Sequence, residues 1–314
     1  MTALSLTEAS KLAVANGETK RGAIINLYAE NSDIMNAMKF DGIQGNAYAW
    51  DQEGGLPSTA FRGVNEGYTA SAGSFNPQKI ALMIGGGDLD VDNFIMKTQG
   101  DNVRSRHEAL KVKSLAQNIT DTVVNGDNTS EPREFDGLQT LCIGDQLIAN
   151  GATSGGDVLS LAKLDELIDS VANPTHLIMS RAVKRAFIQA SRTSTSGVGV
   201  NLLVERDELG RPFQTYSDLP ILTGYPKNKN TAILPYSEAN PGGGSAVGTS
   251  IYCVNFGEDG VMGITNGGLQ VRDLGELDTA PVWRTRIEWF LSMVMLSPYS
   301  AARLWGIKTG AFAA

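Results

Sequence analysis

One apolar stripe along residues 102–125 constrains the fold of this chain more than any other feature. The stripe follows the spacing i, i+3, i+4, i+7 and i+11 of an amphipathic helix: Val112, Leu115, Ala116, Ile119 and Val123. Asp101 or Asn102 can cap the start, and Gly126 can supply a left-handed residue after the end. At 1.5 Å per residue the helix is roughly 35 Å long. One face of this helix is therefore expected to be covered and the other to be exposed.

The charge balance limits the classes of partner. Of the 314 residues, 26 are Lys or Arg and 34 are Asp or Glu, which gives a net charge of −8. This balance argues against a general nucleic-acid binder, which needs a basic face, although a local basic patch stays open. The first half of the long helix has such a basic flank: Arg104, Arg106, Lys111 and Lys113.

Residues 43–77 have the pattern of a long, glycine-rich β-hairpin. Tyr48 and Trp50 alternate with small or polar residues, and a second extended stretch containing Phe61, Val64 and Tyr68 follows the break GGLP. An isolated two-stranded hairpin is marginal in water. It must therefore lie on its own body or on a neighbouring subunit.

The N-terminal segment, residues 5–40, is predicted to form short, weakly amphipathic helices. Ser5 and Glu8 have the spacing of a capping box. The segment has few large apolar residues, so we expect it to depend on other surfaces for order.

The second half mixes helices and strands without regular βαβ alternation, which places the chain in the α+β class. Trp283 to Leu296 begins with period-2 alternation and becomes apolar on both faces, as in a strand that enters a core. The other expected elements are a helix over 164–171, a strand over 176–179, a helix capped by Ser180, a hairpin over 205–216 around Gly210, a flexible loop over 238–249 and a strand over 251–256.

Candidate chemical sites are weak. Asp88, Asp90 and Asp92 have the spacing that opens a calcium loop, but the glycine and glutamate that such a loop requires are missing. Three acids on one face of an exposed strand is the favoured interpretation. Residues 85–87 are three glycines, for which a bulge or bend is favoured over a phosphate cradle.

The remaining reactive residue types do not form a recognisable arrangement. Ser154 and Ser245 lie in glycine-rich loops, His107 lies among charged residues of the long helix, and His176 precedes a buried strand. Cys142 and Cys253 are expected to be small buried residues. We therefore assign no catalytic, cofactor-binding or metal-ligating residues. A pair of carboxylates for acid–base chemistry stays open, since nothing selects one.

Targeting signals are not found. The N-terminus lacks the basic and apolar regions of a secretory signal, and the longest apolar run, 289–296, is too short for a bilayer. Two widely spaced cysteines favour a reducing compartment. We expect a protein that is made in the cytosol and has no membrane partner.

The order of these elements resembles the major capsid proteins of tailed bacteriophages, which share the Johnson fold with encapsulin shells. The resemblance covers nearly the whole chain and lies in the order and spacing of its motifs. These are LTEASKL, GNAYAWDQEGGLPSTAFRGVNEGY, NITDTVVNGD, EFDGL, ERDELGRPFQTY and RTRIEWFLSMVMLSPYSAARLWGI.

The resemblance implies a division of the chain into five parts. Residues 1–42 would be an N-terminal arm and 43–79 an extended hairpin loop that lies on an adjacent subunit. Residues 80–149 would form a peripheral domain with the spine helix 102–125, residues 150–275 an axial domain, and residues 276–314 the return to the peripheral domain.

The function that the resemblance implies is a viral structural protein, not an enzyme. It would self-assemble through hexamers and pentamers into an icosahedral shell that encloses double-stranded DNA, with only weak non-specific contact to the DNA. The subunit contacts would include Trp50, Phe61, Arg62 and Tyr68, because aromatic residues and Arg are enriched at interfaces.

The same resemblance bears on partners and location. It implies a portal, assembly in the bacterial host cytoplasm and a place in the virion, with a decoration protein left open. No long helical region precedes the arm, so we expect a separate scaffolding protein. Residues 44–78 contain no Lys, which argues against the lysine–asparagine cross-link of some relatives. The alternatives are an encapsulin-like nanocompartment with an enzyme cargo and, from another class, an intracellular α+β hydrolase.

Overall fold

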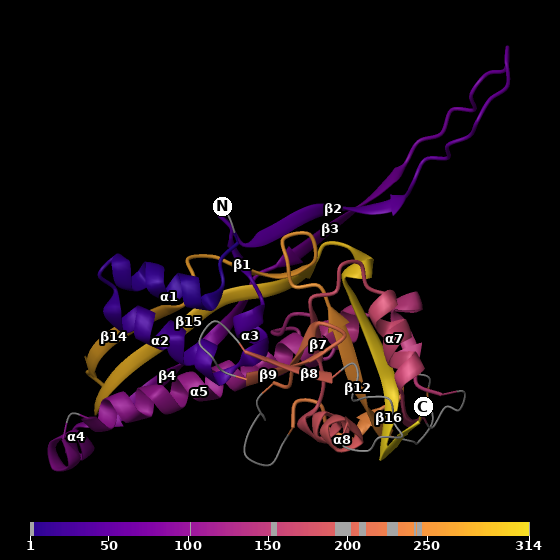
Figure 1. Cartoon of the computed structure of the whole chain (residues 1–314). Coiled ribbons are helices and arrows are strands. Elements are labelled where there is room, and N and C mark those ends of the chain that lie inside the picture. Colours follow the sequence, from indigo (N-terminus) through magenta and orange to yellow (C-terminus); the bar gives the residue numbers. More distant parts are fainter. Residues whose placement is uncertain are drawn as a thin grey trace.

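The computed structural model describes residues 3–100, 102–151, 156–191, 202–206, 212–224, 232–241, 243 and 247–313. Helices and strands are mixed, so the predicted α+β class is confirmed. Two sheets form the body, and a two-stranded ribbon projects from it (Figure 1). The short elements that connect them are α6 (Leu138–Leu141), a 3₁₀ turn at Gly144–Gln146 and another at Pro298–Ser300.

The first sheet has five strands and is organised by β15 (Ala280–Met295). One side of β15 pairs along its length with β4 (Met83–Asp92). The other side pairs with β14 (Gln270–Leu277) and then with β13 (Val261–Thr265), and β1 (Phe40–Gly42) pairs with β13. The strand predicted for residues 283–296 is thus confirmed, and it lies at the centre of its sheet.

The long helix α5 (Asn102–Asn125) has the predicted bounds. Every residue of its predicted stripe is buried, in one cluster with Ile287, Trp289 and Leu291 of β15. Its end differs from the prediction, because Gly126 is not in the left-handed region. A Cβ at Gly126 would lie 2.3 Å from the Phe135 carbonyl oxygen and 2.5 Å from the Thr122 carbonyl oxygen. Glycine is therefore required here for close packing, not for a positive φ.

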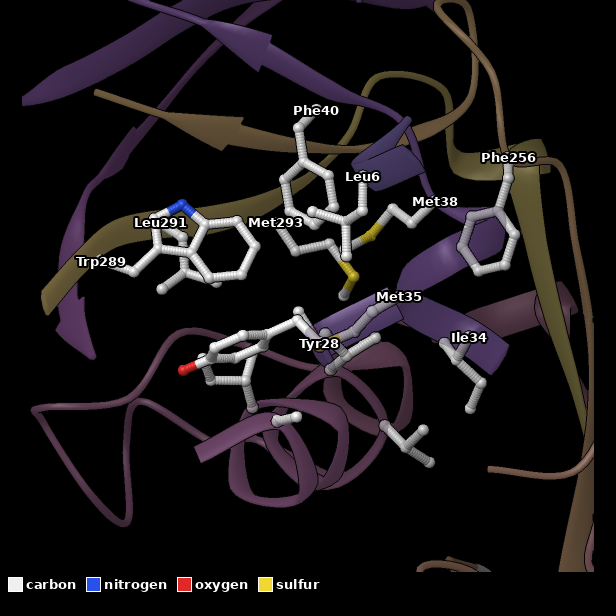
Figure 2. Packing of buried hydrophobic residues seen from close by; sticks show 14 of the residues in the cluster. Leu6, Tyr28, Ile34, Met35, Met38, Phe40, Phe256, Trp289, Leu291 and Met293 are labelled. Carbon is white, nitrogen blue, oxygen red and sulfur yellow. The ribbon is translucent and has the colours of Figure 1, made fainter. Parts of the chain in front are cut away.

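The N-terminal segment is not a free arm. It folds into α1 (Leu6–Ala15), α2 (Thr19–Asn31) and α3 (Asp33–Ala37), and α1 begins with the predicted Ser5–Glu8 capping box. These helices and the residues after them contribute fully buried side chains to the main core, which Figure 2 shows beside Trp289 and Met293 of β15. Their buried side chains include Leu6, Tyr28, Ile34, Met35, Met38 and Phe40. The segment thus obtains its order from its own body.

The ribbon consists of β2 (Ala47–Gly55) and β3 (Ser74–Ala81), which pair from Ala47↔Ala81 to Gly55↔Ser74. The second strand of the hairpin is therefore not the stretch that contains Phe61, Val64 and Tyr68. Those residues lie between the strands, in residues 56–73, which have no strand pairing. Residues 80–81 end β3, and β4 begins at Met83.

The second sheet, which has nine strands, is sandwiched between two apolar clusters. Along β12 (Val247–Val254), Tyr252 and Val254 face the main core, whereas Ile251 and Cys253 face a second core. The second core is closed by α7 (Leu161–Asp169) and α8 (Arg181–Ser191), both predicted, and Ser180 caps α8. The other strands are β5 (Leu147–Ala149), β6 (Asp157–Ser160), β7 (His176–Ile178), β8 (Leu202–Arg206), β9 (Pro212–Tyr216), β10 (Leu219–Leu222), β11 (Glu238–Ala239) and β16 (Ala301–Ala313).

Three expectations for the second half are decided by this sheet. The hairpin strands around Gly210 are confirmed, since β8 pairs with β9, although Gly210 itself lies outside the described residues. The loop predicted for 238–249 was wrong at both ends, because Glu238 and Ala239 pair with Gly248 and Val247. The strand expected over 251–256 begins and ends earlier, as β12, which pairs with β16, and β16 also pairs with β5 and β6.

Candidate assembly surfaces

The tip of the ribbon, residues 56–73, carries several large apolar side chains that are exposed. Phe61, Val64 and Leu56 are 107%, 91% and 80% exposed, and Tyr68 is 71% exposed. The Arg62 guanidinium lies 5.3 Å from the centroid of the Tyr68 ring and donates a hydrogen bond to the Glu66 carbonyl oxygen. Exposed apolar side chains gathered on one projection indicate a contact with another molecule.

Trp50 has a different role from the other three predicted contact residues. It lies at the base of the ribbon, stacked on Tyr48 with ring centroids 5.9 Å apart. Both rings pack against a small cluster formed by Met262, Ile264 and Val294 of the five-stranded sheet. The structure thus brings Arg62 and Tyr68 together at the tip, whereas Trp50 anchors the ribbon to the body.

A second apolar surface, which the sequence did not reveal, lies beside α1. A groove of about 360 Å³ opens between α1, α2 and the five-stranded sheet. Leu12 and Val14 of α1 are about half exposed, at 53% and 49%. Leu12 lines the groove together with Leu4, Leu6, Ile25, Phe40, Leu269 and Trp289.

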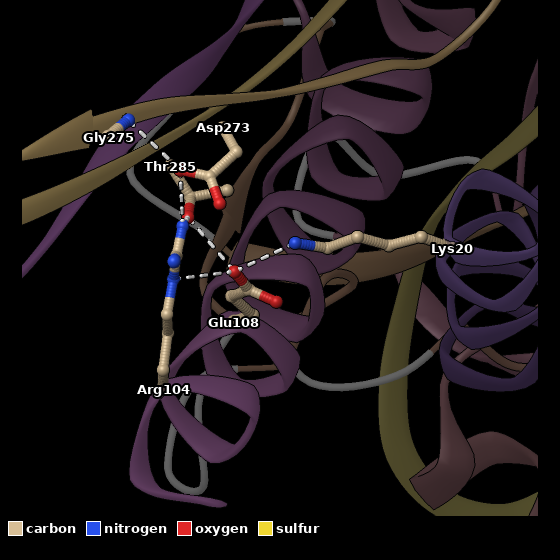
Figure 3. Close-up of polar contacts among 6 residues, drawn as sticks. All are labelled: Lys20, Arg104, Glu108, Asp273, Gly275 and Thr285. Atoms are coloured by element: carbon tan, nitrogen blue, oxygen red, sulfur yellow. Dashed lines mark hydrogen bonds and ion pairs between the residues drawn. The ribbon is translucent and has the colours of Figure 1, made fainter. Parts of the chain in front are cut away.

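An ion-pair network holds the start of α5 to the sheet and to α2 (Figure 3). The Arg104 guanidinium lies 2.7 Å from an Asp273 carboxylate oxygen of β14 and donates to the Thr285 hydroxyl of β15 at 2.7 Å. The Thr285 hydroxyl donates to Glu108 at 2.9 Å, and Lys20 Nζ of α2 lies 3.1 Å from the same Glu108 oxygen. The hydrogen bond from Arg104 lowers the pKa of Asp273 below its ordinary value.

The three predicted acids of β4 are engaged with their own neighbours. Asp88 and Asp90 lie opposite Arg286 and Arg284 in the ladder, and each carboxylate accepts two hydrogen bonds of 2.7–2.9 Å from its arginine. These hydrogen bonds lower the pKa of both aspartates. Asp92 instead caps α4 (Asn93–Gln99) by accepting from the Phe94 amide. The arrangement is a pair of cross-strand ion pairs plus a helix cap.

The three glycines of β4 do not form a bulge. Each pairs in unbroken register with β15, from Gly85↔Trp289 to Gly87↔Ile287. A Cβ at Gly86 would lie 2.4 Å from the Ile287 carbonyl oxygen and 3.0 Å from the Glu288 Cα. The glycines therefore permit a close approach between two long strands.

The two cysteines and His176 are largely buried, and this burial favours their uncharged forms. Burial raises the pKa of both Cys142 and Cys253 to about 12 and lowers the pKa of His176 to about 4. His107 is exposed on α5. Ser154 and Ser245 lie outside the described residues.

Two further searches of the described residues are negative. No group of three or more His, Cys, Asp or Glu side chains there could hold a metal ion. Within the same part of the chain, every helix is too short or too polar to span a membrane.

The comparisons with known proteins agree on the fold. Residues 16–160, a little under half of the chain, match the family model of major capsid protein GP7. No curated protein sequence matches the chain significantly. Among solved structures, the SrpI encapsulin complex of Synechococcus elongatus PCC 7942 has a TM-score of 0.63 at 17% identity and covers 88% of each chain.

Two further solved structures have comparable TM-scores. A chain of Mycobacterium phage Adephagia has a TM-score of 0.62 at 11% identity, covering 89% of this chain and 90% of that one. The capsid of a native GTA particle has a TM-score of 0.59 at 11% identity, covering 86% and 88%. The chain therefore has the Johnson fold that phage capsid and encapsulin subunits share, and its residues 16–160 match the major capsid protein GP7 family.

Proposed function

We propose that this chain is the major capsid protein of a tailed bacteriophage and that it assembles through hexamers and pentamers into an icosahedral shell around double-stranded DNA. The fold and the match to a capsid family support this proposal. The observation that carries it is the β2–β3 ribbon, which projects from the body and exposes Phe61 and Tyr68 at its tip (Figure 1). The role is structural and needs no bond chemistry.

The ribbon divides into a part that serves the subunit and a part that serves assembly. Strand pairing and the packing of Trp50 fix the base of the ribbon to the body. The ribbon therefore keeps its direction relative to the body. Its tip, residues 56–73, has no strand pairing, and its large apolar side chains are exposed. We infer that Phe61, Arg62 and Tyr68 contact an adjacent subunit, because an aromatic–arginine cluster is typical of an interface anchor.

The division of the subunit follows the two sheets. In this proposal the five-stranded sheet with α5 forms the peripheral domain, and the nine-stranded sheet forms the axial domain that gathers at the symmetry axes. Relative to the sequence-based division, residues 301–313 move to the axial part because β16 belongs to the nine-stranded sheet. A portal, a separate scaffolding protein and assembly in the host cytoplasm belong to the same proposal.

The experiment is a deletion that removes the tip but keeps the strands. Deleting 50–64 would cut into β2, so the sharper variant replaces residues 56–73 with Asn-Gly, because Gly55 and Ser74 are already paired and a two-residue turn can join them. We expect subunits that fold with an unchanged melting temperature but form no shells in sedimentation and electron microscopy. Shells of normal size from this variant would contradict the proposed role of the tip.

Point variants distinguish the effect of losing the aromatic side chains from the effect of shortening the loop. Phe61→Ser with Tyr68→Ser keeps the loop but removes its aromatic surface, and we expect shell yield to fall at least tenfold. The matched control is Ser58→Ala, which alters the same loop, removes no apolar surface and keeps the hydrogen bond from the Ser71 hydroxyl to the Ser58 carbonyl oxygen. An equal loss of shells in the control would show that the aromatic side chains are not the contact.

An encapsulin-like shell is the second candidate, favoured by the similarity to the SrpI encapsulin structure. The contents of purified particles distinguish the two functions. Particles filled with DNA support the capsid, whereas particles that contain an enzyme and no DNA support the nanocompartment.

A further inference from the structure

We propose that the outer crest of α5 is a binding surface for the nucleic-acid backbone and that it faces the enclosed DNA in the assembled shell. We define the crest by four exposed or partly exposed residues on one flank of the buried stripe, namely Arg106, Leu110, Lys113 and Gln117. The inference rests on the proposed function, because only a capsid encloses DNA. It concerns a basic flank that the fold itself does not explain.

The four basic residues of α5 differ in whether they contact other groups of the chain. Arg104 is engaged with Asp273 and Glu108, and Lys111 turns toward β4, where a Cβ at Gly87 would lie 2.7 Å from its Nζ. Arg106 and Lys113 are exposed, and the described residues place no ion-pair partner beside either. Two of the four cations are therefore left for a partner outside the subunit.

Along α5 itself, no exposed acid lies close to these two cations. Glu108 is the only acid between residues 102 and 120, and it is buried in the network at the base of the helix. Asp121, one turn beyond Gln117, ends the basic stretch and accepts a hydrogen bond from Asn125. Lys97 of the neighbouring helix α4 is also exposed. The whole chain has a net charge of −8, so this part of α5 has a local charge of the opposite sign.

The geometry suits a polyanion more than a compact ligand. Arg106 and Lys113 are seven residues apart, about 10 Å along the helix on one face. Double-stranded DNA carries one charge per roughly 1.7 Å of its axis, so it offers phosphates to both cations at once without a fixed register. The binding of DNA by two or three cations of one subunit is weak. A shell presents the same cations on many subunits to one DNA molecule, which strengthens the overall binding.

The salt dependence of binding tests the proposal. Fluorescence anisotropy of labelled 30-base-pair duplexes of two unrelated sequences is measured with full-length, unassembled chain. Arg106, Lys113 and the neighbouring Lys97 are three cations, which predict a slope of about −2.7 in log K against log salt, so affinity falls about 40-fold between 50 and 200 mM salt. For Arg106→Gln with Lys113→Gln we expect a slope of about −0.9 and a fall of about fourfold, alike for both duplexes.

The matched control removes the same charge from another surface. Lys11 and Lys39 are exposed, and both lie near the Glu8 carboxylate, whose pKa they help to lower. Lys11→Gln with Lys39→Gln should bind DNA with the slope of the unaltered chain. Equal weakening by both double variants, or no DNA binding by the unaltered chain, overturns the proposal.

Assembled particles distinguish failure of this inference from failure of the proposed function. If the crest variant forms normal shells but they package DNA less stably, losing it at lower salt or temperature, the inference is supported. If its shells hold DNA normally but no longer recruit an acidic protein during assembly, the crest is a protein interface and the inference is wrong. If the unaltered chain forms no shells at all, the proposed function fails, whatever the anisotropy shows.

Discussion

At the scale of single residues, the two histidines show how burial decides behaviour. His107 is exposed on α5, whereas His176 lies in β7 with its Nδ1 2.9 Å from the Thr175 hydroxyl and its ring against Phe256. Burial lowers the pKa of His176 to about 4, so its neutral form is favoured in the fold. The residue is a satisfied polar group of a buried strand, as the sequence suggested.

This burial predicts a pH dependence with a definite sign. Between pH 6.5 and 4 the unfolded chain takes up a proton at His176 and the folded chain does not, so the stability is complete above pH 6.5 and falls on acidification. The loss amounts to about 1–3 kcal/mol. Urea unfolding of unassembled subunits at pH 7 and pH 4.5 should show a smaller loss for His176→Gln, with His107→Gln as the control. An unchanged pH dependence in His176→Gln would refute the prediction.

A second residue-scale prediction concerns the close approach of β4 and β15. A Cβ at Gly86 would meet backbone atoms of Ile287 and Glu288, which cannot move without distorting the ladder. Gly86→Ala should therefore destabilise the subunit by about 1–3 kcal/mol. Gly67→Ala is the control, because nothing lies within 4 Å of a Cβ there, and its melting temperature should stay unchanged. A Gly86→Ala subunit as stable as the Gly67→Ala subunit would contradict this packing.

At the scale of elements, α5 is fixed to the body in two ways. Its apolar stripe packs on β15, and its first turns are tied to β14, β15 and α2 through Arg104 and Glu108. Glu108 and Arg104 are both mostly buried, with side chains 11% and 17% exposed. A charge in that position is stable only while its partners are present.

Arg104→Ala should consequently cost about 1–3 kcal/mol of unfolding free energy, since it leaves the Glu108 and Asp273 carboxylates without their shared cation. Arg104→Lys should recover only part of that loss, because one ammonium group cannot reach Thr285 and both carboxylates as the planar guanidinium does. Thermal unfolding of unassembled subunits measures both variants. Arg106→Ala, two residues along and on the exposed side, should stay within about 0.5 kcal/mol, and an equal loss there would argue against the network.

The sequence predicted elements well where burial alternates with a regular period. The α5 stripe and the strand centred on β15 were found because one packing surface dictates each pattern. The second strand of the ribbon was misplaced because residues 56–73 pair with no strand in the described part of the chain that would impose a period. The pairing of Asp88 and Asp90 with Arg286 and Arg284 was missed, although opposite charges at period 2 on two long strands could have indicated it. Folding of the N-terminal helices onto the core depends on contacts distant in sequence, which no local pattern reports.

At the scale of the whole molecule, the subunit is two packed sheets with one projection. Residues 6–40 and the body share a continuous core, so the β2–β3 ribbon is the part of the described chain that extends farthest from it (Figure 1). In our proposal, the exposed apolar projection packs on a neighbouring subunit, which buries its apolar side chains. This is the property that a shell subunit requires.

The central claim is therefore that the tip of the ribbon lies on an adjacent subunit of a closed shell. Cryo-electron microscopy of particles assembled from the purified full-length chain tests it most directly. The account predicts closed shells of hexamers and pentamers in which Phe61 and Tyr68 contact the neighbouring subunit. A monomer that forms no shells, or shells in which residues 56–73 fold back on their own body, would contradict it.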